Sequence, residues 1–430
     1  MKKPVFSILL LWFATFSAVA QQPTAREEIM ADVHRSASNY LAYPKPVGVK
    51  YTAAPKGYKP FYISHYARHG SRWLIGKDEY PAPVRRLRRA QRHGFLTPAG
   101  EQALAILDSV ERMSHGRLGE LTPLGHRQHQ GIARRMFRNF PQVFAGDASI
   151  NARSTIVIRC ILSMQAECLA LQALNPNLRF TTDASRHDMY YMNYEQDENL
   201  SKYRKAPEIA AARSAFWKAT VDSRPFVRRL ISNEDYIRDS VNCDALMSSI
   251  FDVCANMQSL DTELDLYRFF TSEECYQLWR NNNFRWYINY GPSPLTKGKM
   301  PFYEANLLRN IIETADTCVA QENPGATLRF GHEVVIYPLA ALMELGDCGK
   351  AYTEPETLEN RIRNYKIFPM ASNIQLIFFR KKGCDDILVK AMLNEHETTL
   401  PVASETAPYY RWKDVREHYL KKLSEFSIND

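Results

Sequence analysis

Short apolar runs recur along the chain and predict buried β-strands. One starts at Phe61 and breaks at Gly70, where polar residues take over. Runs of this length bounded by turn residues are typical of strands in a covered sheet. Further runs of this kind lie at residues 149–152, 326–330, 374–379 and 386–393. The last two are joined through Lys381-Lys382-Gly383, which predicts a hairpin.

Segments with a helical spacing of apolar residues lie between these predicted strands. Between Thr155 and Leu174 apolar residues recur every three or four positions, which predicts an amphipathic helix. Leu96-Thr97-Pro98 and Leu121-Thr122-Pro123 each place a threonine before a proline. Threonine is a good N-cap and proline is tolerated in the first turn, so we expect a helix to begin at each.

Residues 176–324 have a different pattern, rich in aromatic residues and helix formers and poor in strand signals. We interpret them as a mainly helical cap inserted into an α/β core. The core then consists of residues 21–175 and 325–430. The predicted fold is a Rossmann-like central mixed sheet flanked by helices, with the cap between its two parts.

The first twenty residues have the features of a cleavable secretory signal. Lys2 and Lys3 precede an apolar run to Val19, and small residues stand at Ala18 and Ala20. Gln21, not cysteine, follows, so no lipid anchor is predicted. No later stretch has the length and apolarity of a membrane span. We therefore expect a soluble exported protein, periplasmic or secreted after cleavage near Ala20.

The composition is that of an ordinary folded protein, with 45% hydrophobic and 24% charged residues, and excludes disordered and collagen-like classes. The formal net charge of +8 suits an anionic small molecule, although it also serves solubility. No dense basic stripe accompanies the aromatic run at 268–290, so a nucleic-acid partner is not predicted. The oligomeric state stays open.

An even number of cysteines, eight, is compatible with disulfide bonds in an exported chain. Cys160 and Cys168 are eight residues apart on one predicted helix, about 12 Å of rise, and should not pair with each other. The absence of CxxC pairs and Cys/His clusters argues against a structural zinc site.

Reactive side chains follow three of the predicted strands. They lie in RHGSR at 68–72, RSTIVIR at 153–159 and LRFGHE at 328–333. In open α/β sheets ligands bind beyond the carboxyl ends of the strands. We therefore expect all three segments to line one crevice.

These residue types indicate a phosphate ester. The guanidinium forks of Arg68, Arg72 and Arg159 match phosphoryl oxygens and offset their charge without a metal or other cofactor. A neutral imidazole, His69, can attack phosphorus and form a phosphohistidine, and nearby cations lower its pKa. Glu333, if protonated, can give its proton to the leaving alkoxide.

Two further residues complete the predicted site. His332 is assigned to phosphate binding beside the three arginines. Gly70 is expected to leave room for the phosphate against the backbone.

The motifs resemble those of the histidine acid phosphatases, the larger branch of the histidine phosphatase superfamily, across most of the mature chain. RHGSR resembles RHGxR, and RSTIVIRCILSMQA resembles RSTDxDRxxxSA, whose second arginine lines the phosphate pocket. FGHEVVIYPLAALMEL resembles FGHDxxxxPLLxxL. The resemblance is strongest to multiple inositol polyphosphate phosphatases and phytases, and it implies inositol polyphosphates such as phytate as substrates.

The chain departs from these motifs at several positions. His332-Glu333 replaces the usual His-Asp, and the His-Ala-Glu variant of inositol polyphosphate phosphatases is not present either. Glutamate is longer than aspartate by about 1.5 Å, so a glutamate at this position reaches the leaving oxygen if the backbone recedes slightly. Ile156 and Ile158 replace the acidic pair that precedes the second arginine in the family.

Other readings stay open. The protein could be a sugar-phosphate or broad acid phosphatase, a phosphomutase as in the smaller branch, or a binding protein that has lost turnover. His65 is assigned to packing or support of the site, not to a metal pair with His69. His126 and His129 lack a nearby acidic residue in the sequence, so surface positions are expected for them.

Overall fold

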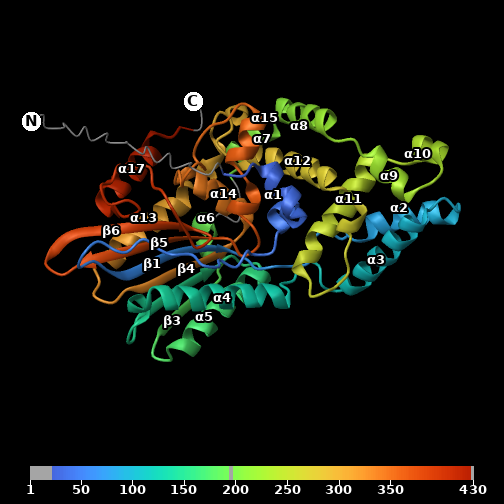
Figure 1. The fold of residues 1–430 in the computed structure, drawn as a ribbon. Coiled ribbons are helices and arrows are strands. Elements are labelled where there is room, and N and C mark those ends of the chain that lie inside the picture. Colours follow the sequence, from blue (N-terminus) through green and yellow to red (C-terminus); the bar gives the residue numbers. More distant parts are fainter. Residues whose placement is uncertain (1–21, 193–196, 428–430) are drawn as a thin grey trace, which may run out of the picture.

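A mixed β-sheet forms the centre of the fold (Figure 1). The computed structural model describes residues 22–192 and 197–427, so the predicted signal peptide at 1–20 lies outside the described residues. The described strands are ordered β3-β2-β4-β1-β5-β6-β7, with β8 paired to β6. Their bounds are β1 (Lys59–Arg68), β2 (Ser149–Ser154), β3 (Arg179–Asp183), β4 (Gly325–Gly331), β5 (Asn373–Lys381), β6 (Cys384–Leu393), β7 (His396–Thr398) and β8 (Tyr410–Arg411).

The strands that carry the reactive motifs are neighbours in this sheet. β2, β4 and β1 run parallel, and their register pairs Arg68 with Gly331 and Ser154 with Phe330. β5 returns antiparallel to β1, and β6 follows it in a hairpin. The predicted mixed α/β sheet and its five predicted strands are confirmed.

Helices cover both faces of the sheet (Figure 1). Along β1, Tyr62 and Tyr66 face one apolar cluster, whereas Ile63 and Ala67 face another, because side chains alternate along a strand. The first cluster is built with α13 (Ala305–Val319), α14 (Glu333–Leu342) and α17 (Trp412–Glu425). The second is built with α4 (Pro123–Asn139) and α5 (Ile158–Leu174).

The predicted helix starts are confirmed. Thr97 caps α3 (Pro98–Ser114) by accepting a hydrogen bond from the Gly100 amide, and Thr122 caps α4 in the same way through the Gly125 amide. α5 begins at Ile158, three residues after Thr155, because the Thr155 amide still donates to Phe330 O of β4 and residues 156–157 form a bend before the helix.

Most of residues 176–324 is helical, as expected, and packs beside the sheet layer. α2 (Pro81–Arg92) and α3 join α9 (Arg224–Leu230) and α11 (Cys243–Asn256) in a separate apolar cluster. Within 176–324, β3 and α13 belong to the sheet layer, and the division into core and cap domains stays a prediction. The other helices are α1 (Ala25–Ala31), α6 (Met189–Met192), α7 (Glu198–Lys205), α8 (Pro207–Thr220), α9 (Arg224–Leu230), α10 (Glu234–Ser240), α11 (Cys243–Asn256), α12 (Ser272–Tyr290), α15 (Pro355–Arg361) and α16 (Asn364–Ile367).

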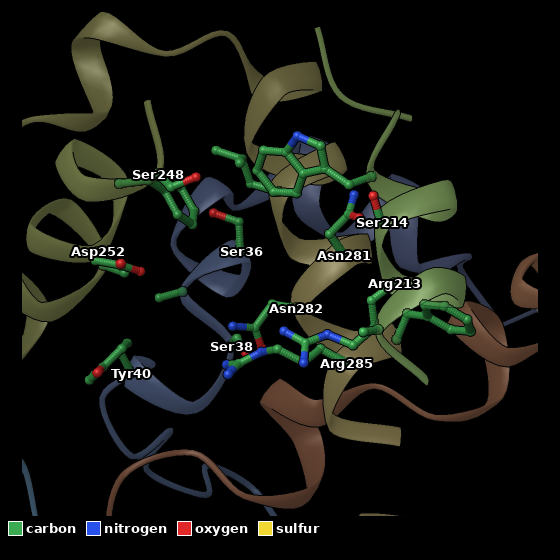
Figure 2. Close-up of a pocket in the computed structure, with 17 residues that line it drawn as sticks. Ser36, Ser38, Tyr40, Arg213, Ser214, Ser248, Asp252, Asn281, Asn282 and Arg285 are labelled. Atoms are coloured by element: carbon green, nitrogen blue, oxygen red, sulfur yellow. The ribbon is translucent and has the colours of Figure 1, made fainter. Parts of the chain in front are cut away.

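Short 3₁₀ helices connect these elements, and one of them borders a cavity. A cavity of about 570 Å³ opens between η1 (Val33–Tyr40), α8, α11 and α12 (Figure 2). The 3₁₀ helices are η1 (Val33–Tyr40), η2 (Pro141–Phe144), η3 (Arg186–Asp188), η4 (Met257–Ser259), η5 (Tyr267–Phe269), η6 (Pro294–Thr296) and η7 (Met300–Glu304).

The eight cysteines are free thiols, so the expectation of disulfide bonds is wrong for this structure. Cys160 and Cys168 lie on α5, and burial raises the pKa of each to about 12. Buried thiols of this kind pack as small apolar side chains. Among the described residues, no helix combines the length and apolarity needed to cross a bilayer.

Candidate active site

The three predicted segments meet at one edge of the sheet, at the carboxyl ends of β1, β2 and β4. The amide of His69 donates to the Gly331 carbonyl over 2.9 Å, and the amide of Thr155 donates to the Phe330 carbonyl over 3.0 Å. These two hydrogen bonds extend the parallel pairing of β1 and β2 with β4 by one residue. The segments that follow β1 and β2 therefore leave the sheet at the same edge.

The His69 ring is buried, and one of its nitrogens is held by the backbone. Nδ1 lies 2.8 Å from the Gly70 carbonyl oxygen, an acceptor, so Nδ1 carries the proton. Burial lowers the pKa of His69 well below its usual range, and Arg159 and Arg68 lower it further. The ring is therefore neutral, and Nε2, which has no hydrogen-bond partner, keeps its lone pair for an incoming group.

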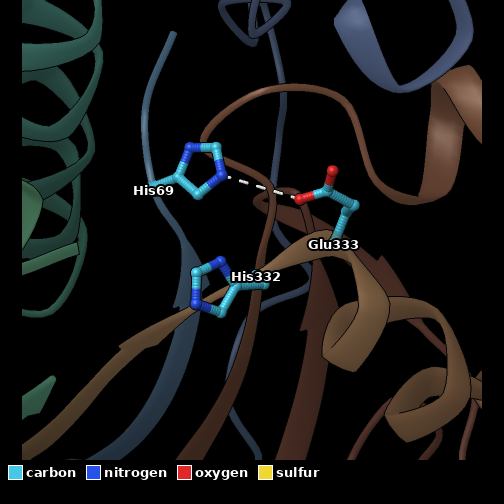
Figure 3. Close-up of side chains that lie close together, drawn as sticks. All are labelled: His69, His332 and Glu333. Carbon is cyan, nitrogen blue, oxygen red and sulfur yellow. Dashed lines mark ion pairs between the residues drawn. The ribbon is translucent and has the colours of Figure 1, made fainter. Parts of the chain in front are cut away.

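Glu333 opens α14 and directs its carboxylate toward His69 (Figure 3). Its oxygens lie 3.6 Å from His69 Nε2, 3.1 Å from Arg68 Nε and 3.9 Å from an Nη of Arg72. Burial alone would raise the pKa of Glu333, but the charges of Arg68 and Arg72 hold it well below its ordinary value. In the ligand-free protein Glu333 is thus a carboxylate, so the acid role predicted from the sequence requires it to gain a proton first.

Two of the predicted arginines are buried and anchored by backbone carbonyls. One Nη of Arg68 donates to Asn39 O over 2.6 Å and to Phe368 O over 3.0 Å. An Nη of Arg72 donates to Trp73 O over 2.9 Å. The second Nη of Arg68 and Nε of Arg72 are buried without a hydrogen-bond partner. Buried donors are almost always satisfied, so their presence here favours an anion as ligand.

Arg159 and His332 complete the group. Arg159 lies in the first turn of α5, and after burial its charge is the foremost cause that lowers the pKa of His332 to about 3. The His332 ring lies 5.7 Å from that of His69, and its Nε2 is 3.3 Å from Thr155 Oγ1. The structure thus gathers all six residues predicted from the sequence around one position.

His69, His332 and Glu333 also have the spacing of a metal site, since one ligand atom from each lies within 4.8 Å of the others. Arg68, Arg72 and Arg159 surround this group, however. Guanidinium charges repel a cation and attract a phosphoryl group, so the electrostatics favour an anion here.

Known proteins share this sequence pattern. The family model for the histidine phosphatase superfamily (branch 2) matches residues 67–394, which include all six site residues predicted from the sequence. The chain belongs to this family.

Its relatives include inositol phosphate phosphatases. Multiple inositol polyphosphate phosphatase 1 of Gallus gallus is 20% identical over 381 residues, 85% of this chain and 82% of the relative. The multiple inositol polyphosphate phosphatase of Bifidobacterium longum, solved with inositol hexasulfate, superposes with a TM-score of 0.73 at 18% identity, covering 90% of this chain and 97% of that one. The phytase from D. castellii gives a TM-score of 0.67 at 15% identity, covering 96% and 89%. At these identities the two structures establish a shared fold.

Gly70 does not have the role expected from the sequence. A Cβ atom there would lie 2.5 Å from the carbonyl oxygen of Gly125, and a Cβ on Gly125 would lie 2.4 Å from that of Ser71. The room at Gly70 is taken by the backbone of α4, so this member of the branch 2 family uses the glycine to bring a helix against the loop that carries His69.

His129 is also placed differently from the expectation. It is fully buried, and its Nδ1 lies 2.7 Å from a carboxylate oxygen of Glu167 on α5. The other oxygen of Glu167 lies 3.6 Å from Nε2 of buried His65. His65 is therefore a packing residue, as predicted, whereas His129 is not at the surface; His126 is half-buried.

Asn39 and Tyr40 also belong to the site, although no pattern in the sequence indicated them. Asn39 holds Arg68 through its carbonyl, and its Nδ2 lies 3.5 Å from Glu333. The Tyr40 ring lies 5.4 Å from the guanidinium carbon of Arg72. Neither residue stands in a motif or next to a predicted strand, so only long-range pairing information would have found them.

Proposed function

We propose that the protein is an exported, metal-independent phosphomonoesterase that acts through a phosphohistidine on His69. Its proposed substrates are inositol polyphosphates such as phytate. The main support is the state of His69: its ring is neutral, its Nδ1–H is held by Gly70 O, and its Nε2 has no hydrogen-bond partner, while Arg159 and Arg68 lie close enough to lower its pKa. A fixed tautomer with a free Nε2 is what attack on phosphorus requires.

In the first step Nε2 of His69 forms a bond to phosphorus, and the bond between phosphorus and the ester oxygen breaks. Arg68, Arg72 and Arg159 hold the equatorial oxygens as charge shifts to the leaving group. The leaving oxygen takes a proton from Glu333 and departs as an alcohol. In the second step Glu333 removes a proton from water, the water oxygen attacks phosphorus, and the bond to Nε2 breaks.

Glu333 has to become protonated before it can act as this acid. The substrate phosphate would compete with the Glu333 carboxylate for Arg68 and Arg72 and displace it. A carboxylate beside a bound phosphate and deprived of its arginines has a higher pKa, because like charge and burial both disfavour its ionised form. A monoanionic ester brings the required proton with it.

The substrate class is supported by the relatives. One is a multiple inositol polyphosphate phosphatase solved with inositol hexasulfate, and another is a phytase. Export is supported by the basic, apolar and small-residue pattern of residues 1–20.

Trapping of the covalent intermediate tests the proposal. Wild-type protein mixed with ³²P-labelled phytate and quenched within milliseconds should carry label that is stable to base and released by acid. His69→Ala should carry none, whereas His93→Ala, which changes an exposed histidine, should label normally. Label that survives in His69→Ala, or phosphate release that EDTA abolishes, would overturn the mechanism.

A further inference from the structure

The cavity beside η1 has the size of a small-molecule site and lies next to the phosphate position. Ser38 and Tyr40 of η1 line the cavity, while Asn39 between them contacts Glu333. Tyr40 also packs against Arg72. An ester whose phosphate is held at His69 would therefore extend from the arginines past Tyr40 into this cavity of about 570 Å³.

One wall of the cavity is cationic. Arg213 of α8 and Arg285 of α12 lie near each other in Figure 2, and each projects from its helix into the cavity. Within 22–192 and 197–427, neither guanidinium has a carboxylate at ion-pair distance. Burial and the charge of Arg285 both lower the pKa of Arg213. Two like charges brought together in this way are stabilised by a bound anion.

The opposite wall is different in character. Asp252 of α11 lies across the cavity from the two arginines, with the hydroxyls of Ser36 and Ser248 on its side (Figure 2). A carboxylate accepts hydrogen bonds from hydroxyl groups and repels phosphate. This wall therefore accommodates alcohol groups better than further phosphates.

We propose that the cavity selects polyols that carry a second phosphate toward Arg213 and Arg285 and free hydroxyls toward Asp252. Partly phosphorylated inositols meet this description better than the fully phosphorylated ring. The inference rests on the proposed phosphatase function and adds to it a preference within the substrate class.

Steady-state kinetics on three esters tests the preference. The esters are an inositol trisphosphate, inositol hexakisphosphate and p-nitrophenyl phosphate, which has no second anion. Arg213→Gln and Arg285→Gln should each raise KM for the trisphosphate about tenfold or more and change p-nitrophenyl phosphate turnover less than about twofold. Lys218→Gln, an exposed residue of α8 outside the cavity, is the matched control and should change neither.

Asp252→Asn tests the second wall. It should raise kcat/KM for the hexakisphosphate relative to the trisphosphate by about fivefold, because a repulsive charge is removed. Equal effects of the cavity variants on all three esters, or none, would overturn the inference while leaving the phosphatase proposal intact.

Measurements of ligand binding test the cavity assignment independently of the phosphatase proposal. If wild-type protein hydrolyses none of the esters, the phosphatase proposal fails, but calorimetry in a His69→Ala background still measures inositol trisphosphate affinity. A loss of about tenfold on adding Arg285→Gln supports the cavity assignment, and unchanged affinity overturns it.

Discussion

The Glu333 carboxylate lies 3.6 Å from Nε2 of His69, the atom proposed to attack phosphorus. It also lies 3.1 Å from Arg68, so in the ligand-free protein an internal anion takes up part of the position proposed for the substrate phosphate. Binding of substrate and displacement of Glu333 are therefore one event, and its consequences are measurable.

Phosphate binding should be accompanied by proton uptake. Glu333 has a pKa well below its ordinary value in the free protein because Arg68 and its neighbours stabilise the carboxylate. Its pKa rises when phosphate takes those arginines. Between the two pKa values the complex holds more protons than the free protein, so affinity should weaken as pH rises. Calorimetry in two buffers with different ionisation enthalpies should show this uptake, and it should be absent in Glu333→Gln.

Replacement of Glu333 should affect esters according to their leaving groups. Glu333→Gln should slow hydrolysis of alkyl phosphates about 100-fold or more, because the alkoxide then leaves without its proton. p-Nitrophenyl phosphate, whose leaving group scarcely needs protonation, should be slowed far less. Equal losses for both esters would show that Glu333 is not the proton donor.

The buried group of His65, Glu167 and His129 should contribute to stability. The two histidines lower the pKa of Glu167 to about 2 against the effect of burial. Its stabilisation is thus present in full above pH 4.5, the value for an unperturbed glutamate, and lost as pH falls toward 2. Glu167→Gln should lower the free energy of unfolding by about 3 kcal/mol at pH 7, with the difference shrinking below pH 4.5. Denaturant titrations across this range would measure it.

Substrate preference should change with pH through Asp252. Desolvation raises the pKa of the Asp252 carboxyl to about 6; Arg285 opposes this effect and Glu79 adds to it. Tyr40 also lies close enough to interact with Asp252. Below pH 6 the carboxyl is neutral, so the ratio of hexakisphosphate to trisphosphate kcat/KM should be higher at pH 5 than at pH 7. Asp252→Asn should remove this change; a ratio that still shifts equally would exclude Asp252 as its source.

The sequence predicted the sheet and the site residues for related reasons. Apolar runs mark strands that are covered on both faces, and the polar residues that directly follow them must lie at strand ends. His69 and His332 could therefore be assigned to one crevice from local sequence alone. That β1 and β4 are direct neighbours in the sheet could be learned only from the structure.

Contacts between distant segments could not be predicted from the sequence. Glu167 comes 38 residues after His129, and only the packing of α4 on α5 brings them together. Asn39 and Tyr40 lie in a short 3₁₀ helix without a strong pattern. The ionisation state of Glu333 could not be predicted for another reason. Its pKa depends on the distances to three side chains from β1 and the loop after it.

Arg68 is held by two carbonyls that are far apart in the chain, those of Asn39 and Phe368. The guanidinium therefore cannot reach its working orientation until polypeptide synthesised more than three hundred residues apart has come together. We expect a nascent or partly unfolded chain to be inactive, even when the RHGSR segment is intact. Enzyme activity then reports completed folding. A proteolytic cut that releases the C-terminal strands should abolish this activity.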